Sequence, residues 1–319
     1  KVLDQHLPKA LDLLSDLFHR SRFGAKEIEK ERQVVLEEIR MVQDDPEDLV
    51  QELHTSQVMG RHPLGRPILG TPVSISNLTR RDILGYVLRH YHPHETVVAM
   101  AGNFDQRRLL KWLDAQFGRF ERAQTPKRQR TPAAVHYGLQ VHEKDLEQAH
   151  LCVGLKGISV EHKDRYAAAL LNAVLGGNVS SRLFQEIREK RGLAYSIYSS
   201  LSAYSDGGLW SVYAGTRPSE AARVVELIRK EIARLCTHKI SADELARAKN
   251  QMKGSVMLGL ENTASRMAQI ASTMNEFASS NQQIAANVGE ISGLSETVSV
   301  SLKQSEEDSV KLSRAAEEV

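Results

Sequence analysis

Two acidic side chains with the spacing of a shared site, Glu31 and Glu38, lie in the stretch 27–43, EIEKERQVVLEEIRMVQ. They are seven residues apart, and a helix has about 3.6 residues per turn, so both carboxylates face the same way on a helix. One interpretation is a metal site, in which one carboxylate is a ligand and the other orients it. The alternative is a solvated acidic face, relieved by basic neighbours on the same helix: Lys30, Arg32 and Arg40.

The helix that positions these glutamates is predicted by an apolar stripe. Its members recur at helical spacing, which is typical of an amphipathic helix with one buried face: Ile28, Val35, Ile39 and Val42. The stripe fixes which way the helix packs but does not choose between the two interpretations of its carboxylates.

Histidines that could complete a metal site are not arranged for one. Of the twelve histidines, only His90 and His94 have the four-residue spacing that places two ligands on one helical face. Pro93 lies between them and breaks the helix that such a pair needs. We therefore expect loop histidines at the end of a helix.

Composition restricts the class of protein. The chain has 319 residues, 41% of them hydrophobic, which is ordinary for a globular protein with two domains. A net charge of +2 gives no argument for nucleic acid as a partner. No stretch is long and apolar enough for a membrane span. Cys152 and Cys236 lie far apart in sequence and form no metal-type pair, so we expect buried free thiols and a reducing compartment.

Helical periodicity dominates the first part of the chain. The segment 60–70, GRHPLGRPILG, is expected to be a loop. Thr96–Ala101 is predicted to be a short buried strand. Besides 27–43, helices are predicted over 3–20, 47–59, 80–91 and 105–117.

A stretch rich in Pro, Lys and Arg, residues 123–135, is predicted to link two domains. The part that follows alternates strands with helices, which favours a layered α/β domain that occurs twice. Strands are predicted over 137–142, 150–155, 194–203 and 209–214, and the turn at 204–208, which contains Gly207 and Gly208, joins the last two as a hairpin. Helices are predicted over 164–175, 181–190, 218–236 and 241–259.

The last stretch, residues 272–319, lacks Pro, Trp, Tyr and Cys. Its apolar residues alternate in steps of four and three, which is a heptad pattern and predicts a coiled-coil-like helix that needs a partner helix.

Several strings, in this order, resemble the M16 family of zinc metallopeptidases, the insulinase and mitochondrial-processing-peptidase-like group, over about residues 1–270. They are ALDLLSDL, EIEKERQVVLEEI, HPLGRPILG, VVAMAGNFD, LGGNVSSRLFQEIREKRGLAYSIYS and GTRPSEAARVVELI. The resemblance implies an α/β (α+β layered) fold of two similar domains with antiparallel-rich sheets and helices. We expect domains at 1–122 and 136–271, the linker at 123–135 and a helical tail at 272–319.

The resemblance assigns roles to four residues. In the family, zinc is held by the two His of His-x-x-Glu-His and by a later Glu, which corresponds to Glu38. Glu31 corresponds to a carboxylate that supports the zinc ligands. Arg188 and Tyr195 correspond to a pair that binds the substrate: the Arg donates to a peptide carbonyl, and the Tyr hydroxyl stabilises the oxyanion.

Two departures qualify the resemblance. The sequence contains no His-x-x-Glu-His, so we expect the first domain to be incomplete and this chain to be inactive with a weak, incomplete Zn²⁺ site. The tail resembles the C-terminal signalling helix of methyl-accepting chemotaxis receptors, and a fusion is one explanation.

The sequence therefore predicts a processing-peptidase-like zinc endopeptidase acting on flexible peptides, inactive in this form. We expect a homo- or heterodimer with another M16 subunit, no nucleic acid, no membrane, and a bacterial cytoplasmic location. One alternative is a non-catalytic peptide-binding partner subunit of an M16 peptidase. The other is a helical signalling or oligomerisation module fused to a peptidase relic.

Overall fold

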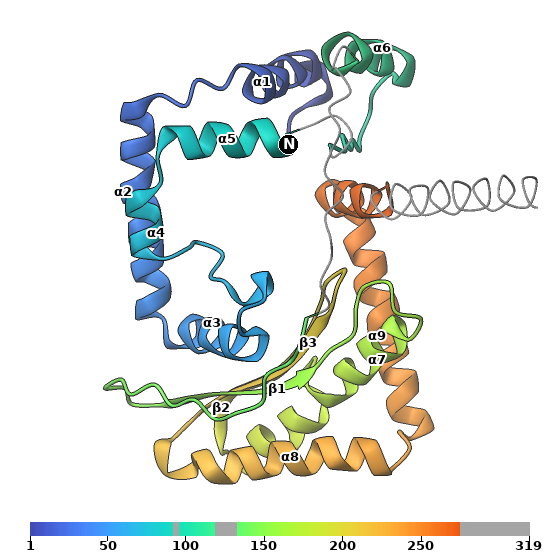
Figure 1. The fold of residues 1–319 in the computed structure, drawn as a ribbon. Helices are drawn as coiled ribbons and strands as arrows, with labels where there is room; N and C mark the ends of the chain where they lie inside the picture. Colours follow the sequence, from blue (N-terminus) through green and yellow to red (C-terminus); the bar gives the residue numbers. More distant parts are fainter. Residues whose placement is uncertain (92–95, 119–132, 275–319) are drawn as a thin grey trace, which may run out of the picture. The chain divides into compact units, whose positions relative to one another are not determined.

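The computed structural model describes residues 1–91, 96–118 and 133–274 of the chain (Figure 1). Contacts divide the chain into two compact units. The smaller comprises Lys1–Leu11, Pro93–Phe120 and Gly259–Val319, and the larger comprises Asp12–His92 and Glu121–Leu258. All four residues with expected roles lie in the larger unit.

An antiparallel sheet of three strands, in the order β1–β3–β2, lies at the centre of the larger unit. β2 and β3 form a hairpin, and β1 pairs with the other side of β3. The strands are β1 (Ala149–Lys156), β2 (Ala194–Ala203) and β3 (Gly208–Thr216). Successive side chains of a strand point to opposite faces, so Val212 and Tyr213 on β3 belong to different layers.

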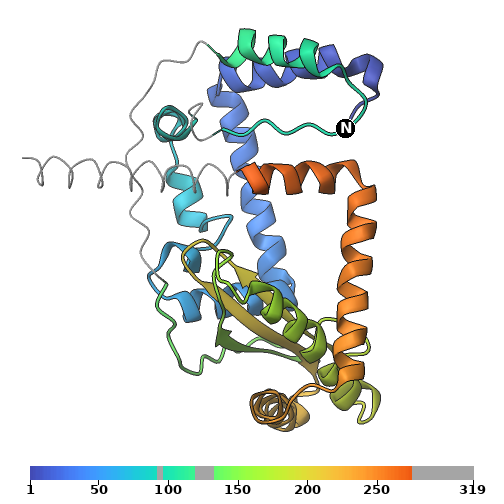
Figure 2. The same cartoon turned by 90° about the vertical axis from the view of Figure 1, so that its right-hand side faces the viewer.

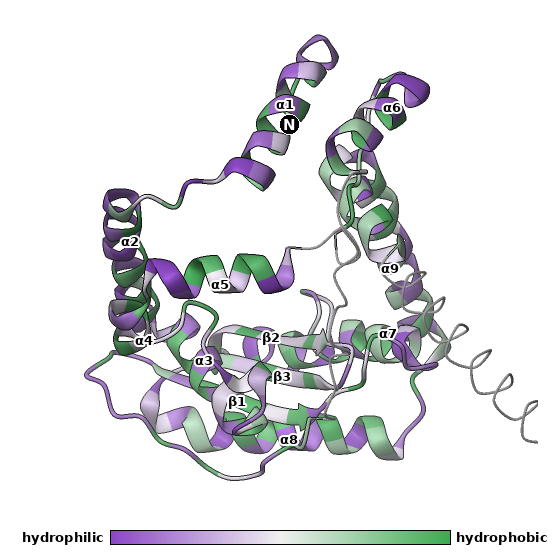
Figure 3. Ribbon diagram, turned by 45° about the horizontal axis from the view of Figure 1, so that its top comes forward, coloured by the Kyte–Doolittle hydropathy of each residue, from purple (hydrophilic) through white to green (hydrophobic). Residues whose placement is uncertain are grey.

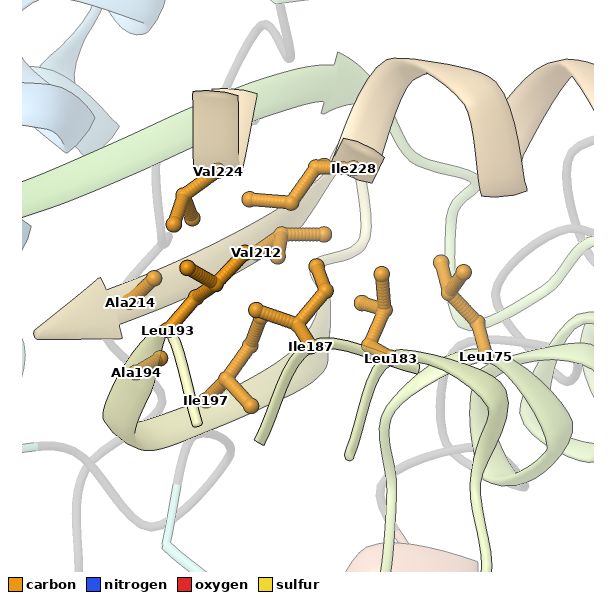
Figure 4. Close-up of a cluster of buried hydrophobic side chains, with 10 residues drawn as sticks. All are labelled: Leu175, Leu183, Ile187, Leu193, Ala194, Ile197, Val212, Ala214, Val224 and Ile228. Atoms are coloured by element: carbon orange, nitrogen blue, oxygen red, sulfur yellow. The ribbon is translucent and has the colours of Figure 1, made fainter. Parts of the chain in front are cut away.

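One face of the sheet carries the main hydrophobic core, against α7 (Arg165–Leu175), η4 (Phe184–Glu189) and α8 (Ala221–Thr237). Figure 4 shows Val212 and Ala214 of β3 among the buried side chains of these helices. The full cluster is Leu175, Leu183, Ile187, Leu193, Ala194, Ile197, Val212, Ala214, Val224 and Ile228.

The other face of the sheet is covered by α3 (Pro46–Met59), which contacts β1 and β3. Figures 1 and 2 show α3 and α8 on opposite sides of the sheet. The approach is close, because a Cβ added at Gly154 would lie 2.2 Å from Nε2 of His54. Only glycine therefore permits the packing of α3 on β1.

Buried polar contacts add to this packing. The hydroxyl of Tyr198 donates to Oε1 of Glu47 at 2.6 Å, and Nε2 of Gln51 donates to the same hydroxyl at 2.7 Å. The ring of Tyr213 lies 5.1 Å from that of Tyr198, and its hydroxyl is 2.9 Å from Nδ1 of His150. The first part of the chain is thus tied to the sheet by hydrogen bonds as well as by apolar contact.

α2 (Ala25–Asp44) meets α3 at Asp45, whose side chain accepts hydrogen bonds from the backbone N–H groups of Glu47 and Asp48 and so caps α3. Arg32 of α2 donates to the backbone oxygens of Ile75 and Leu78, which hold α4 (Pro72–Asn77) beside α2. The other elements are η1 (Asp4–His6), α1 (Leu7–Arg20), η2 (Pro63–Gly65), α5 (Arg80–His90), η5 (Pro218–Glu220) and α9 (Ala242–Glu261).

The smaller unit contains α6 (Gln106–Phe117), capped by the side chain of Asp105, which accepts from the backbone N–H of Arg108 at 3.0 Å. Nδ2 of Asn103 donates to Asp4 at 2.9 Å. Residues 263–274 are helical. Among the helices of the described ranges, none combines the length and the apolar composition that crossing a bilayer requires.

The expected fold class, helices layered on an antiparallel sheet, is confirmed. Two predicted strands are wrong: residues 96–101 and 137–142 form no ladder in the described part of the chain. In the second of these, the alternating apolar side chains are solvated, since Tyr137, Leu139 and Val141 are 79%, 90% and 73% exposed. Alternation predicts a strand only where one face becomes buried.

Other expectations lie wholly or largely outside the described residues: most of the linker 123–135, the coiled-coil-like tail beyond residue 274, and Pro93 with His94. The boundaries expected for the two domains stay a prediction.

The bond between Tyr198 and Glu47 should stabilise the larger unit. Burial and the Glu47 carboxylate raise the pKa of Tyr198, so its contribution is present below about pH 10, the ordinary value for tyrosine, and is lost above it. We expect Tyr198→Phe to lower the free energy of unfolding by about 1–2 kcal/mol at pH 7. We also expect the variant to lose stability less steeply above pH 10 than the unmodified protein.

Urea denaturation at pH 7 and above pH 10 measures the difference in free energy of unfolding between the variant and the unmodified protein. Tyr204→Phe, at an exposed position in the β2–β3 turn, is the control and should change little. Equal stability of Tyr198→Phe and the unmodified protein at pH 7 would contradict the assignment.

Candidate functional site

Glu31 and Glu38 lie on α2, as the sequence predicts, and both side chains are exposed. The apolar stripe adjoins the two glutamates on the helix surface and packs inward, with Ile39 buried and Ile28, Val35 and Val42 half-buried. Figure 3 shows hydrophilic and hydrophobic positions alternating along α2. The helix therefore presents both carboxylates to solvent.

Of the three basic neighbours expected to relieve these carboxylates, Arg32 and Arg40 are engaged by other acids. Arg32 pairs with Glu29 at 3.0 Å, and Arg40 pairs with Glu37. Within the described ranges, neither Glu31 nor Glu38 makes a hydrogen bond or ion pair, so the relief by Arg32 and Arg40 that the solvated interpretation assumed is not formed.

A complete metal site is not assembled around these carboxylates. No three His, Cys, Asp or Glu side chains of the described residues converge as a ligand set. Structural and catalytic zinc sites use three or four protein ligands, so the residues that the structure describes do not by themselves fit a zinc ion at Glu38.

The cysteines follow the expectation only in part. Both are free thiols; Cys152 is half-buried and Cys236 is exposed. Burial and the nearby Glu47 raise the pKa of the Cys152 thiol to about 12, so it stays protonated and unreactive at neutral pH. The exposed position of Cys236 on the outer side of α8 corrects the expectation of a buried thiol.

Arg188 lies on η4, a π-helix over Phe184–Glu189, where the sequence predicts an ordinary α-helix. The wider turn closes with a bond from the N–H of Lys190 to the oxygen of Gln185 at 3.0 Å. Single π-turns inside helices are frequent at functional sites. The adjacent Ile187 is fully buried (Figure 4), which fixes the direction in which Arg188 leaves the helix.

Tyr195 lies at a β-bulge, where the pairing of β2 with β3 shifts between Ala194 and Ser196. A bulge re-aims a side chain that a regular strand would place in the ladder. Tyr195 is 76% exposed, whereas Ala194 beside it is buried in the core. The bulge thus turns the tyrosine out to solvent from a rigid strand.

The structure brings Arg188 and Tyr195 together. The guanidinium carbon of Arg188 lies 5.5 Å from the centre of the Tyr195 ring and 4.8 Å from that of the Phe184 ring. These are cation–π distances. Among the described residues, the side chain of Arg188 has no hydrogen-bond or ion-pair partner, so its guanidinium N–H groups are available to a ligand.

Glu186, two residues before Arg188, is bound to other cations. It accepts from Lys190 and from Nη1 of Arg191, the latter at 2.7 Å. These two cations hold the pKa of Glu186 below its usual range. Glu186 is therefore committed to other bases, and Glu189, which directly follows Arg188, makes no ion pair among the described residues.

A second ion pair anchors the start of this segment. Arg182 donates from Nε and Nη2 to the two oxygens of Glu244 at 2.8 and 2.9 Å. Glu244 also belongs to the capping box that Ser241 forms at the start of α9. Arg182 lowers the pKa of Glu244 to about 2, and the pair ties the segment before η4 to α9.

A cavity of about 930 Å³ lies elsewhere in the larger unit, between α3, β1 and residues 135–148. None of the four residues with expected roles lines it. Its size alone therefore does not make it the centre of chemistry.

Sequence reasoning missed Phe184, the π-turn and the bulge. Phe184 is four residues before Arg188, a spacing that places two side chains on one helical face, so this neighbour could have been found. The π-turn and the bulge depend on the burial of Ile187 and Ala194 by distant parts of the chain and carry no local signal.

Sequence profiles of two domains of one peptidase family match the chain. The profile described as insulinase (peptidase family M16) covers residues 1–72, and the profile described as the peptidase M16 inactive domain covers residues 77–252. The chain belongs to peptidase family M16. Glu31 and Glu38 fall within the first M16 match, and Arg188 and Tyr195 within the second.

Relatives carry names that agree with this family. An uncharacterized zinc protease of Bacillus subtilis (strain 168), YmxG, is 41% identical over 267 residues, which are 84% of this chain and 65% of that protein. One from Streptomyces coelicolor is 39% identical over 279 residues, 85% of this chain and 60% of that protein. The M16 chain thus spans less than two-thirds of either relative.

Solved structures share the fold. A peptidase M16 inactive domain from Pseudomonas fluorescens aligns with a TM-score of 0.77 at 21% identity, covering 88% of this chain and 69% of that chain. A protease from Helicobacter pylori aligns with a TM-score of 0.74 at 23% identity, covering 86% and 68%. These likenesses establish the arrangement of helices and sheet that M16 proteins share.

The pair of Arg182 and Glu244 should stabilise the protein only where Glu244 is ionised. Its pKa falls from 4.5 to about 2 on folding, so the contribution is present above about pH 4.5 and is lost as the pH falls towards 2. We expect Glu244→Gln to lower the free energy of unfolding by about 1–3 kcal/mol at pH 7. The variant and the unmodified protein should converge below pH 4.

Denaturant unfolding from pH 7 to pH 3 measures this convergence. Glu226→Gln removes the exposed pair with Arg229 on α8 and serves as the control with little expected change. A deficit of Glu244→Gln that is as large at pH 3 as at pH 7 would show that the cause is not the ion pair.

Proposed function

We propose that this M16 chain binds flexible, extended peptides through Arg188 and Tyr195. The main support is the arrangement of the Arg188 guanidinium: two aromatic rings lie beside it, and no acidic side chain of the described residues is bound to it. In this proposal, Arg188 donates to a peptide carbonyl, and the exposed hydroxyl of Tyr195 donates to the carbonyl oxygen of the bond that is to be cleaved.

We further propose that binding belongs to zinc-dependent peptide hydrolysis of the processing-peptidase type, with Glu38 as one zinc ligand and Glu31 supporting the ligand set. The names of the relatives support zinc as the metal. The positions of both carboxylates on one exposed face of α2 are compatible with these roles. Because the sequence contains no His-x-x-Glu-His, this proposal requires other groups to supply two histidine ligands and the catalytic glutamate.

A non-catalytic partner subunit is the second candidate. Two observations favour it: the sequence contains no His-x-x-Glu-His, and the longer of the two matching profiles is that of the inactive M16 domain. In this role the chain would form a dimer with an M16 subunit that carries the motif. Co-purification with such a subunit, and peptide cleavage only by the mixture, would distinguish it from the first candidate.

The peptide-binding assignment predicts that Arg188→Met weakens binding about 10-fold or more, because a charge-assisted hydrogen bond contributes about 1.5–3 kcal/mol. Tyr195→Phe should weaken binding less, since it removes one neutral donor. Fluorescence anisotropy of a labelled flexible peptide measures both affinities. Arg229→Met is the control of the same charge change and should bind like the unmodified protein; equal affinity of Arg188→Met would contradict the assignment.

The chain alone should not cleave peptides. With a quenched fluorescent peptide, we expect no signal above buffer, either with added zinc or with a chelator. The reason is that the sequence lacks the His-x-x-Glu-His motif, which supplies two histidine ligands and the general base. Cleavage that a chelator abolishes and zinc restores would overturn the claim that the site is incomplete.

A further inference from the structure

The basic segment around η4 contains more charge than its acids neutralise. Residues 182–191 carry four basic and two acidic side chains. Arg182 is bound to Glu244, whereas Lys190 and Arg191 are bound to Glu186. Arg188 is therefore the one cation of this segment that lacks an ion pair with a described residue.

The surroundings of Arg188 also limit how a ligand can reach it. Phe184 and Tyr195 place ring faces 4.8 and 5.5 Å from its guanidinium carbon. A guanidinium that stacks on rings keeps its N–H groups in its own plane, at the edge. Those donors form a flat fork, and the exposed Tyr195 side chain carries a hydroxyl that offers a further donor.

A flat fork of donors with a full positive charge matches a carboxylate better than a carbonyl. A carboxylate accepts two parallel hydrogen bonds from one guanidinium and neutralises its charge, whereas a carbonyl accepts without neutralising it. Neither neighbouring acid is paired with Arg188 in the structure: Glu186 is engaged by Lys190 and Arg191, and Glu189 makes no ion pair among the described residues.

We propose that Arg188, with Tyr195 beside it, recognises a carboxylate of the bound peptide. The carboxylate belongs either to an acidic side chain or to the C-terminus of the peptide. This inference rests on the proposed peptide-binding function and adds a substrate class to it: peptides with an anionic group near the bound segment bind more tightly than neutral ones.

Four versions of one flexible, labelled peptide test the proposal: a single Glu with a free C-terminus, Gln with a free C-terminus, Glu with an amidated C-terminus, and Gln with an amidated C-terminus. For the unmodified chain, we expect the loss of the recognised carboxylate to weaken binding about 10-fold. Whether the Gln or the amide causes the loss identifies the source. The difference should shrink in high salt, since it is electrostatic.

Variants then assign the effect to Arg188. Arg188→Met should bind all four peptides with nearly the same affinity, and Arg188→Lys should restore part of the discrimination, because it keeps the charge without the fork. Arg229→Met should discriminate like the unmodified chain. Circular dichroism of each variant establishes that it is folded.

The outcomes separate the two proposals. If the unmodified chain binds all four peptides equally while Arg188→Met weakens all of them, the carboxylate reading is wrong and the peptide-binding function stands. If Arg188→Met changes no affinity, both are wrong. If discrimination persists in Arg188→Met, another cation reads the carboxylate and the assignment to Arg188 is overturned.

Discussion

The burial of Ile187 and Ala194 in one core is the constraint on which the candidate peptide-binding pair, Arg188 and Tyr195, depends. Each is the immediate neighbour of a residue of the pair, and both lie in the same apolar cluster (Figure 4). Arg188 is half-buried and Tyr195 is exposed, and each has a buried neighbour, so the rotamer freedom lost on binding a ligand is small compared with that of a loop residue. The π-turn and the bulge are the local distortions that this shared burial imposes, and each directs one side chain outward.

The sheet also connects the candidate site to the first part of the chain. β2 carries Tyr195 at its start and Tyr198 on the face that meets α3, where the Glu47 carboxylate accepts a hydrogen bond from the Tyr198 hydroxyl. α3 in turn continues α2 through the cap at Asp45. The strand that presents the tyrosine of the candidate site and the helix that presents Glu31 and Glu38 are thus joined by one short route of hydrogen bonds and covalent chain, within a single compact unit.

How much of this the sequence could predict follows from the range of the interactions. The hairpin of β2 and β3 and the stripe of α2 are encoded locally, in a Gly-containing turn between two apolar runs and in a 3.6-residue period, and both are confirmed. The strand expected at 137–142 has an equally good local pattern, yet it finds no pairing partner in the described chain, and partners are set by tertiary structure. The contact of Phe184 with Arg188 joins residues four apart in sequence and can be predicted from their spacing. The direction of the Tyr195 side chain depends on the bulge in the pairing of β2 with β3 and cannot be predicted in this way.

The two candidate centres differ in how completely this chain defines them. Arg188 and Tyr195 have fixed neighbours and free donors, and a peptide can use them as they stand. Glu31 and Glu38 are solvated carboxylates on a helix whose only buried side chain among the described residues is Ile39, and like charges on one face repel until a cation lies between them. A metal ion bound there would relieve the repulsion between the two carboxylates. The affinity of this face for zinc would depend on the other groups that supply the remaining ligands. In the proposed function, peptide binding therefore relies on residues of this chain, whereas hydrolysis needs further groups.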